Sequence, residues 1–282
     1  MMRELCTKLS QIVKETGEML LSATDVENLG GVSEKGTAAN LVTKYDVAVQ
    51  EQLISEIRKI IPEAEFISEE KENDSSLVKA PYLFIIDPID GTANFVHDYR
   101  HSCISLAMFN EGECVIGVVY DPFQNELFSA VRGGGAFLNG KQVSVTERDV
   151  EYGIYTFGSS PYYKNTLGAK SFEIAKHFFD LFGDLRRSGA AALDLAYLAA
   201  GRIDLFFELK LSPWDYAAGM LLVEEAGGVI TNMNGEPLSF VSTDSVIAAT
   251  KKSYEAAMKE LKMLNFTLAM QRIWQKNSLT AT

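Results

Sequence analysis

The sequence predicts a mixed protein in which an α+β half, over about residues 1–145, precedes an α/β half, over about residues 146–265. Predicted helices and then a run of consecutive strands fill the first half, whereas strands and helices alternate in the second. The chain has 282 residues, of which 47% are hydrophobic, enough to bury a sizeable core. Because it contains no repeats and no long linker, we expect one domain across residues 1–282, with a tail over 266–282.

Two helices are predicted to open the first half. Residues 2–22 carry apolar side chains near helical spacing, and residues 27–40 then form a glycine-bearing polar loop. Thr43 and Asp46 have the form of a capping box, which opens the second helix, and Pro62 ends it. The predicted apolar stripe of this second helix is Val49, Leu53, Ile57 and Ile60.

Consecutive strands are predicted to follow, each a short run rich in β-branched and aromatic residues. They are EFISEE (65–70), PYLFIID (81–87), SCISLAMFN (102–110), ECVIGVVYD (113–121) and ELFSAV (126–131). Asn139-Gly140 supplies the positive-φ pair that a type I′ turn needs, so AFLNGKQVSV (136–145) is predicted to form a hairpin.

Elements of the two kinds alternate after about residue 146. The predicted strands are GIYTFG (153–158), IDLFFE (203–208) and SVIAAT (245–250). The predicted helices cover 171–182, 189–201 and 214–227, and a last one starts at Ser253. This alternation is typical of an α/β arrangement.

Composition narrows the classes of partner. The net charge of −12 and the sequence pI of about 4.8 disfavour nucleic acids and anionic membranes, which require clustered Lys and Arg. No run of eighteen apolar residues occurs, and the N-terminus lacks an apolar signal core. Cys6, Cys103 and Cys114 have no metal-type spacing and suit a reducing compartment. We therefore expect a cytoplasmic protein with buried thiols that binds neither nucleic acid nor membrane.

The stretch IIDPIDGTANF, Ile85–Phe95, is the strongest functional signal. Asp87 and Asp90 emerge from an apolar strand on either side of Pro88, whose fixed φ lets the two carboxylates converge. Oxygen-rich sites of this kind suit Mg²⁺ or Mn²⁺. Gly91-Thr92 follows, where the start of a helix would direct free N–H groups at an anion. Carboxylates next to such a phosphate-binding turn are typical of phosphoryl-transfer sites.

This stretch has three other interpretations. In the simplest, it is a turn in which Asp90 caps a helix and Asp87 is solvated. An EF-hand is excluded, because Pro88 interrupts the loop and Asp98 occupies the twelfth position, where a glutamate is needed. The haloacid dehalogenase signature fails on spacing, because Pro88 stands where the nucleophilic aspartate would be.

Further acids are candidates to complete a metal site. Glu69 and Glu70 end a strand that is predicted to lie beside the one leading to Asp87, although such a pair is often merely solvated. Asp215 lies in the first turn of a predicted helix, where it also suits a capping role. Asp46 has the same structural alternative, in the capping box with Thr43.

Several long stretches in order resemble the inositol monophosphatase family of lithium-sensitive, magnesium-dependent phosphatases. They are NLVTKYD, FISEE, DPIDGTANFVH, GVVYDP, GGGAFLNGKQVSVT, RRSGAAALDLAYLAAG and WDYAAGMLLVEEAGG, spread over about residues 5–265. The resemblance implies a five-layered α-β-α-β-α sandwich and a homodimer.

The resemblance also implies roles for particular residues. The implied metal ligands are Glu69, Asp87, Asp90, Asp215 and the carbonyl of Ile89. Substrate contacts are implied for Asp90, Gly91, Thr92, Ala191 and Glu208, and Asp46 would pair with Thr92. Lys35 would belong to a mobile loop near a third metal, and TFGSSPYYKNTLG and ELKLSPWD would line the substrate side.

The implied reaction is hydrolysis of a small phosphate monoester by metal-activated water, with two or three Mg²⁺ per site or Mn²⁺ as a substitute. Glu69, Thr92 and Asp46 would orient the water and take its proton. Inositol monophosphate is the expected substrate. Relatives use the same ligands on the 2′-phosphate of NADP, 3′-phosphoadenosine nucleotides, fructose-1,6-bisphosphate or histidinol phosphate, so these substrates stay open. A regulatory binding protein is the alternative of a different class.

Overall fold

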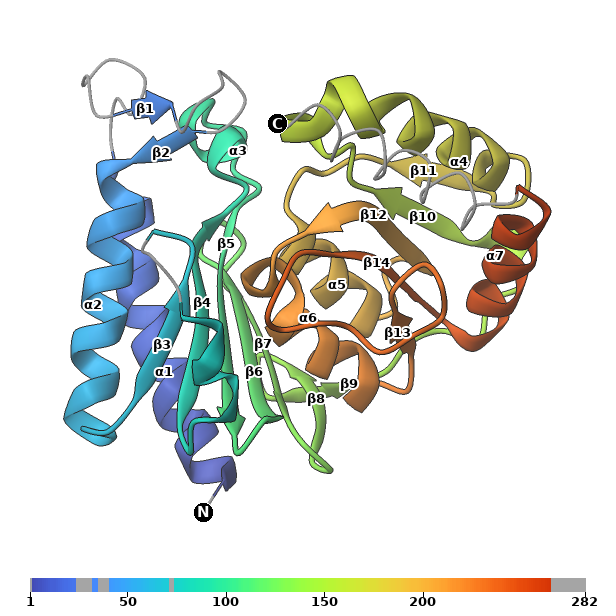
Figure 1. Ribbon diagram of the computed structural model, residues 1–282. Coiled ribbons are helices and arrows are strands. Elements are labelled where there is room, and N and C mark those ends of the chain that lie inside the picture. Colours follow the sequence, from blue (N-terminus) through green and yellow to red (C-terminus); the bar gives the residue numbers. More distant parts are fainter. Residues whose placement is uncertain (1, 24–31, 35–40, 71–73, 265–282) are drawn as a thin grey trace.

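A computed structural model describes residues 2–23, 32–34, 41–70 and 74–264 (Figure 1). In this part of the chain, helices and two sheets alternate in five layers. Helices α1 and α2 cover the outer face of the first sheet, α5 and α6 lie between the two sheets, and α4 and α7 cover the far face of the second sheet (Figure 1). The five-layered sandwich predicted from the resemblance is confirmed.

The helices of the described part have the following bounds. The α-helices are α1 (Met2–Leu21), α2 (Lys44–Ile60), α3 (Thr92–Val96), α4 (Ala169–Phe179), α5 (Ala191–Ala199), α6 (Pro213–Glu225) and α7 (Lys251–Met263). Short 3-10 turns cover Ser75–Lys79, Val150–Tyr152 and Pro161–Tyr163, and a π-helical turn covers Lys164–Gly168.

The first sheet has seven strands in the order β3-β4-β5-β6-β7-β8-β9. Only β3 and β4 are parallel, and the other neighbours are antiparallel. Their bounds are β3 (Glu65–Ser68), β4 (Leu83–Asp90), β5 (Cys103–Asn110), β6 (Glu113–Asp121), β7 (Glu126–Val131), β8 (Gly135–Leu138) and β9 (Lys141–Val143). The predicted hairpin is confirmed, with Asn139 at φ 47° and Gly140 at φ 77°.

The second sheet has five strands in the order β11-β10-β12-β14-β13. The neighbours β11, β10 and β12 are parallel, whereas β14 is antiparallel to β12 and β13. Their bounds are β10 (Ile154–Phe157), β11 (Asp184–Arg186), β12 (Leu205–Leu211), β13 (Val229–Thr231) and β14 (Asp244–Ala249). A separate pair joins β1 (Val32–Glu34) to β2 (Leu41–Thr43).

Three buried apolar clusters fill the spaces between the five layers. The largest joins the inner faces of both sheets to α5 and α6, and includes the fully buried Tyr216 and Phe206. A second lies under α1 and α2, and a third lies under α4 and α7. This largest cluster, around α5 and α6, holds the two halves together, because helices of the second half pack directly on strands of the first.

Some element boundaries were predicted wrongly. Ile60 is 38% exposed, and the buried side chain is instead Ile61, just beyond the end of α2. With 3.6 residues per turn, Ile61 lies closer than Ile60 to the face of the helix that carries Ile57, because Ile61 is four residues after Ile57 and Ile60 is three. Helix α7 begins at Lys251 rather than Ser253, because the Thr250 side chain accepts a hydrogen bond from the Ser253 N–H and caps the helix.

Short strands were also missed. Strands β11 and β13 have three residues each, and β1 lies inside the stretch 27–40 that was predicted as a polar loop. Strand β4 runs three residues farther than predicted, to Asp90, because a bulge lets it continue past Pro88.

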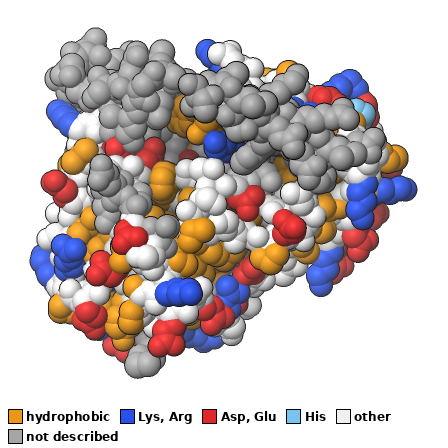
Figure 2. Space-filling model, in the orientation of Figure 1, with side chains coloured by type: hydrophobic (Ala, Val, Ile, Leu, Met, Phe, Trp, Pro, Cys, Tyr) orange, Lys and Arg blue, Asp and Glu red, His pale blue; other side chains and the backbone are white. Residues whose placement is uncertain are grey.

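The structure shows where the cysteines and the charged side chains lie. The three cysteines are free and buried, as predicted. On the face shown in Figure 2, acidic and basic side chains of the described residues are interspersed rather than gathered into one basic patch. None of the helices in the described part of the chain combines the length and the apolar composition of a membrane span.

Candidate active site

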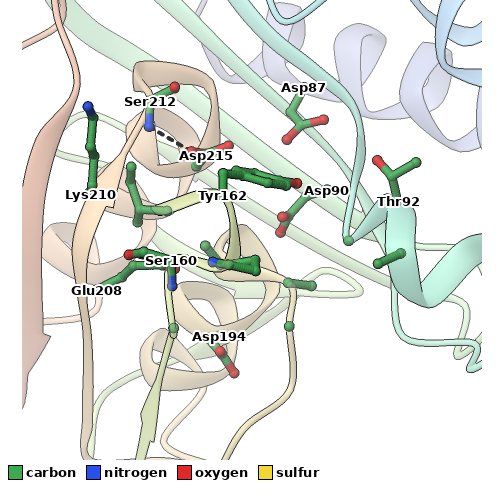
Figure 3. Close-up of a pocket in the computed structure, with 18 of the residues that line it drawn as sticks. Asp87, Asp90, Thr92, Ser160, Tyr162, Asp194, Glu208, Lys210, Ser212 and Asp215 are labelled. Carbon is green, nitrogen blue, oxygen red and sulfur yellow. Dashed lines mark hydrogen bonds between the residues drawn. The ribbon is translucent and has the colours of Figure 1, made fainter. Parts of the chain in front are cut away.

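A cavity of about 250 Å³ opens between the two halves, where segments from both sheets and the central helices meet (Figure 3). Of the residues predicted from the sequence, it is lined by Glu69, Asp87, Ile89, Asp90, Gly91, Thr92, Ala191, Glu208 and Asp215. Asp46 lies behind Thr92, outside the lining. Lys35 lies outside the described residues. Both segments that the resemblance placed on the substrate side contribute to the lining.

The bulge in β4 positions the two aspartates of the DPID stretch. Asp87 pairs with Ser105 and Asp90 with Cys103, so two intervening residues on β4 lie opposite one on β5. Asp87 is only 2% exposed, so the interpretation of a solvated turn is wrong. Both side chains reach the cavity from this one strand end.

Backbone N–H groups fix the orientation of three of the carboxylates. The Ile89 N–H donates to Asp87 Oδ1 at 3.0 Å, and the Ala192 N–H donates to Asp90 Oδ2 at 2.7 Å. Asp90 therefore caps α5 on the opposite side of the cavity, rather than the helix that follows it in sequence. Asp215 accepts from the Ser212 N–H at 2.7 Å in a capping box, so its predicted structural role and its place in the cavity coexist.

Gly91 connects the bulge to α3 in a conformation that requires glycine. Its φ is 85°, and a Cβ atom there would lie 3.1 Å from the His101 carbonyl oxygen and 3.2 Å from the Ala190 Cβ. The turn thus brings the backbone of Gly91 and Thr92 to the cavity surface, where the sequence predicted contact with a phosphate.

Asp46 links the start of α2 to Thr92. Its Oδ2 accepts hydrogen bonds from the Thr43 N–H and hydroxyl, both at 2.6 Å. Its Oδ1 lies 3.3 Å from the Thr92 hydroxyl, which is also 3.0 Å from the Ile89 carbonyl oxygen. Burial raises the pKa of Asp46 to about 6, although the Thr43 hydrogen bonds oppose this. Both proposed geometries, the cap and the pairing with Thr92, are present.

The electrostatics of the cavity fit a divalent cation. Burial raises the pKa of Asp87 well above its usual range, and the neighbouring Glu69 raises it further. The pKa of Asp215 is also raised well above its usual range, first by burial and then by the charge of Asp90. Burial raises the pKa of Asp90 to about 6. Buried carboxylates that repel one another are the oxygen donors that Mg²⁺ and Mn²⁺ prefer.

The carboxylates do not yet surround a single point. Among the described residues, no three His, Cys, Asp or Glu side chains are arranged closely enough to hold one ion. In Figure 3 the ring of Tyr162 lies between Asp215 and Asp90. The sequence marked the segment of Tyr162 as substrate-facing but did not single out this residue, because nothing in its local pattern indicates a contact with distant acids.

Glu208 lies on the opposite side of the cavity, on β12. It is 8% exposed and accepts hydrogen bonds from the Ser160 N–H at 2.8 Å and from the Ser160 hydroxyl at 3.2 Å. Burial raises its pKa to about 7, against the effect of these hydrogen bonds. Gly158 leaves room for it, because a Cβ atom there would overlap the Glu208 carboxylate.

Asp194, on α5, is a further lining residue that the sequence did not indicate. It accepts a hydrogen bond from the Ser188 hydroxyl at 2.6 Å, yet burial raises its pKa to about 8. The folded-state pKa lies above the unfolded value, so this carboxyl contributes stability that is fully present below about pH 4 and is lost as the pH rises through about 8.

We therefore expect Asp194→Asn to stabilise the metal-free protein at pH 8 by more than about 1 kcal/mol, and by less at pH 5. The amide is neutral at both pH values and keeps an oxygen to accept from Ser188. Urea unfolding at the two pH values measures the difference. Asp184→Asn is the control, because its exposed carboxyl pairs with Arg186, which lowers its pKa, and its loss should give no gain. Equal effects of Asp194→Asn at both pH values would contradict the assignment.

Comparison with known proteins finds relatives along most of the chain. The model of the inositol monophosphatase family matches residues 1–265. Nus factor SuhB of Escherichia coli K12 is 36% identical over 250 residues, which cover 88% of this chain and 92% of the relative. Inositol-1-monophosphatase of Bacillus subtilis is 34% identical over 230 residues, 81% of this chain and 86% of the relative.

Solved structures show the same fold. The extragenic suppressor protein suhB of Bartonella henselae superposes with a TM-score of 0.82 at 33% identity, covering 92% of this chain and 98% of that one. An IMPase/NADP phosphatase in complex with Mg²⁺ and phosphate has a TM-score of 0.77 at 29% identity, covering 92% of this chain and 94% of that one.

Proposed function

This chain belongs to the inositol monophosphatase family, and we propose that it hydrolyses small phosphate monoesters with the help of Mg²⁺ and acts most readily on inositol monophosphate. One observation carries the proposal: four acidic side chains from three distant segments, Glu69, the Asp87–Asp90 pair and Asp215, line one cavity. Repulsion between buried carboxylates is unfavourable unless a cation offsets it, so their gathering is a functional feature.

The acidic residues would hold the cations. Glu69, Asp87, Asp90, Asp215 and the Ile89 carbonyl would bind two or three Mg²⁺, with Mn²⁺ as a substitute. Once bound, such cations activate water and offset charge on the leaving oxygen. They also explain how a protein with a net charge of −12 can attract a phosphate dianion.

Other residues of the chain would bind the substrate and move a proton. The N–H groups of Gly91 and Thr92 are placed to hold phosphoryl oxygens. The Thr92 hydroxyl would orient the attacking water and pass its proton toward Asp46, whose pKa of about 6 suits a general base near neutral pH, and Glu69 would assist. Glu208 would accept a hydrogen bond from a hydroxyl of the alcohol, beside Ala191.

Glu208 is the basis for favouring a polyol such as inositol, because a buried carboxylate suits a hydroxyl donor. The same chemistry on the 2′-phosphate of NADP, 3′-phosphoadenosine nucleotides, fructose-1,6-bisphosphate or histidinol phosphate is the nearest alternative. Phosphate release from inositol monophosphate and these four alternatives, with and without Mg²⁺, tests the proposal. We expect release only with Mg²⁺ and fastest from inositol monophosphate. No release from any of them would contradict the proposed activity.

A binding role is the second candidate, because several relatives are named Nus factors. We propose that this chain nevertheless does not contact nucleic acid, given its net charge of −12.

We further propose, from the family resemblance, one catalytic domain that acts as a homodimer in the cytoplasm. Light scattering of the purified protein measures the oligomeric state.

Inhibition by Li⁺ is an expected property of the proposed site. We expect Li⁺ in the millimolar range to inhibit Mg²⁺-dependent phosphate release, since a small cation should compete at a site of clustered carboxylates. A titration with LiCl measures this, with KCl at equal ionic strength as the control. Equal rates in both salts would weaken the placement of this chain among the lithium-sensitive members.

A further inference from the structure

Tyr162 lies among the residues that we propose to bind cations. It lines the cavity with them, and Figure 3 shows its ring between Asp215 and Asp90. Burial raises the pKa of the Tyr162 hydroxyl, and the charges of Glu69 and Asp215 raise it further. The phenol therefore lies close to the acidic side chains of the cavity.

The segment that carries Tyr162 is held at one end and irregular at the other. The Gly158 N–H donates to the Phe207 carbonyl at 2.9 Å, and Ser160 donates to Glu208. Ser160 has φ 47°, a left-handed conformation that is unfavourable for a residue with a Cβ atom. The π-helical turn that begins at Lys164 follows directly, and such turns are uncommon.

Tyr162 also borders solvent. The residue is 48% exposed, so part of the ring lies at the mouth of the cavity while the hydroxyl end lies inside it. A side chain in this position can leave the cavity without opening the apolar core.

Tyr163 lines the same cavity but has a different environment. The Lys210 Nζ lies 4.0 Å from the centre of its ring, a cation-π contact on β12. Tyr163 is therefore a matched control for Tyr162. It has the same side chain and lies on the same turn, but its ring packs against the Lys210 ammonium group.

We propose that Tyr162 competes with divalent cations for the space between the carboxylates, so that its ring must withdraw before the cations bind. Tyr162 is thus a positioning residue that sets the cation affinity of the site. This inference rests on the proposed function, since it assumes that the carboxylates bind cations. The apparent dissociation constant of a ligand rises in proportion as the competent conformation becomes less populated.

Calorimetric titration with MnCl₂ alone tests this on the full chain. We expect Tyr162→Ala to lower the dissociation constant for Mn²⁺ about tenfold. This value corresponds to an unsubstituted protein in which the Tyr162 ring is withdrawn from the carboxylates about a tenth of the time. Tyr163→Ala should change it less than about twofold. Equal dissociation constants for Tyr162→Ala and the unsubstituted chain, or equal tightening by both variants, would overturn the inference.

A second measurement does not depend on truncating the ring. Saturation with Mn²⁺ should give a tyrosine difference absorbance that Tyr163→Phe retains and Tyr162→Phe loses, because only the first of these keeps the Tyr162 phenol. Retention of the full signal in Tyr162→Phe would overturn the inference while leaving the cation site intact. If the unsubstituted chain and all variants bound no Mn²⁺, the proposed cation site itself would be wrong, and the inference with it.

Discussion

Asp90→Asn is expected to lower the kcat for Mg²⁺-dependent phosphate release about a thousandfold, equivalent to about 4 kcal/mol, while leaving the fold intact. The substitution removes one charge from the group of carboxylates that would bind cations. It keeps a side-chain oxygen to accept the 2.7 Å hydrogen bond from the Ala192 N–H, so α5 remains capped. Loss of activity without loss of stability is therefore the expected signature.

The control for Asp90→Asn is Asp121→Asn. Asp121 is likewise a buried carboxyl on the first sheet, and it accepts hydrogen bonds from the Phe123 and Gln124 N–H groups at 2.9 and 3.1 Å. It does not line the cavity. Steady-state kinetics and thermal unfolding of both variants separate the two roles. Full turnover in Asp90→Asn would remove Asp90 from the proposed site.

Thr92→Val is expected to lower kcat by about 10²- to 10⁴-fold, the usual contribution of a positioned proton-transfer group. Valine has nearly the shape of threonine but no hydroxyl, so it cannot orient a water or pass a proton toward Asp46. Substrate affinity should change little, because the backbone N–H groups of Gly91 and Thr92 remain. The expected effect is therefore on kcat rather than on KM.

Thr43→Val is the matched control, because Thr43 donates its hydroxyl to the same Asp46 carboxylate from the opposite side. It should lower the free energy of unfolding by about 1 kcal/mol, through loss of the cap of α2, and leave kcat nearly unchanged. An unchanged kcat in Thr92→Val would contradict proton transfer through Thr92, and equal losses in both variants would show that the effect is not specific to the Thr92 hydroxyl.

Much of the fold follows from local patterns in the sequence. The capping box of Thr43 and Asp46 and the Asn139-Gly140 turn are encoded within a few residues, and both were predicted. Strands β11 and β13 were missed because three residues carry no measurable alternation. Their position is determined by pairing with β10 and β14, which a local pattern does not contain.

In the candidate site, too, the features encoded locally could be predicted, whereas those that depend on tertiary packing could not. The carboxylates of Asp87 and Asp90 were found because they follow an apolar strand within a dense local stretch. The contact of Asp90 with the Ala192 N–H joins residues 102 positions apart, and the place of Tyr162 among the carboxylates depends on how the two halves pack. Such contacts are properties of the tertiary structure, and no spacing in the sequence indicates them.

The most direct test of the central claim is a crystal structure of the protein soaked in MnCl₂ and phosphate, with anomalous scattering used to locate manganese. We predict manganese between Glu69, Asp87, Asp90 and Asp215, with phosphate against the Gly91-Thr92 backbone and the Tyr162 ring displaced from between the aspartates. Carboxylates that remain apart, with no anomalous peak within coordination distance of any of them, would contradict the account.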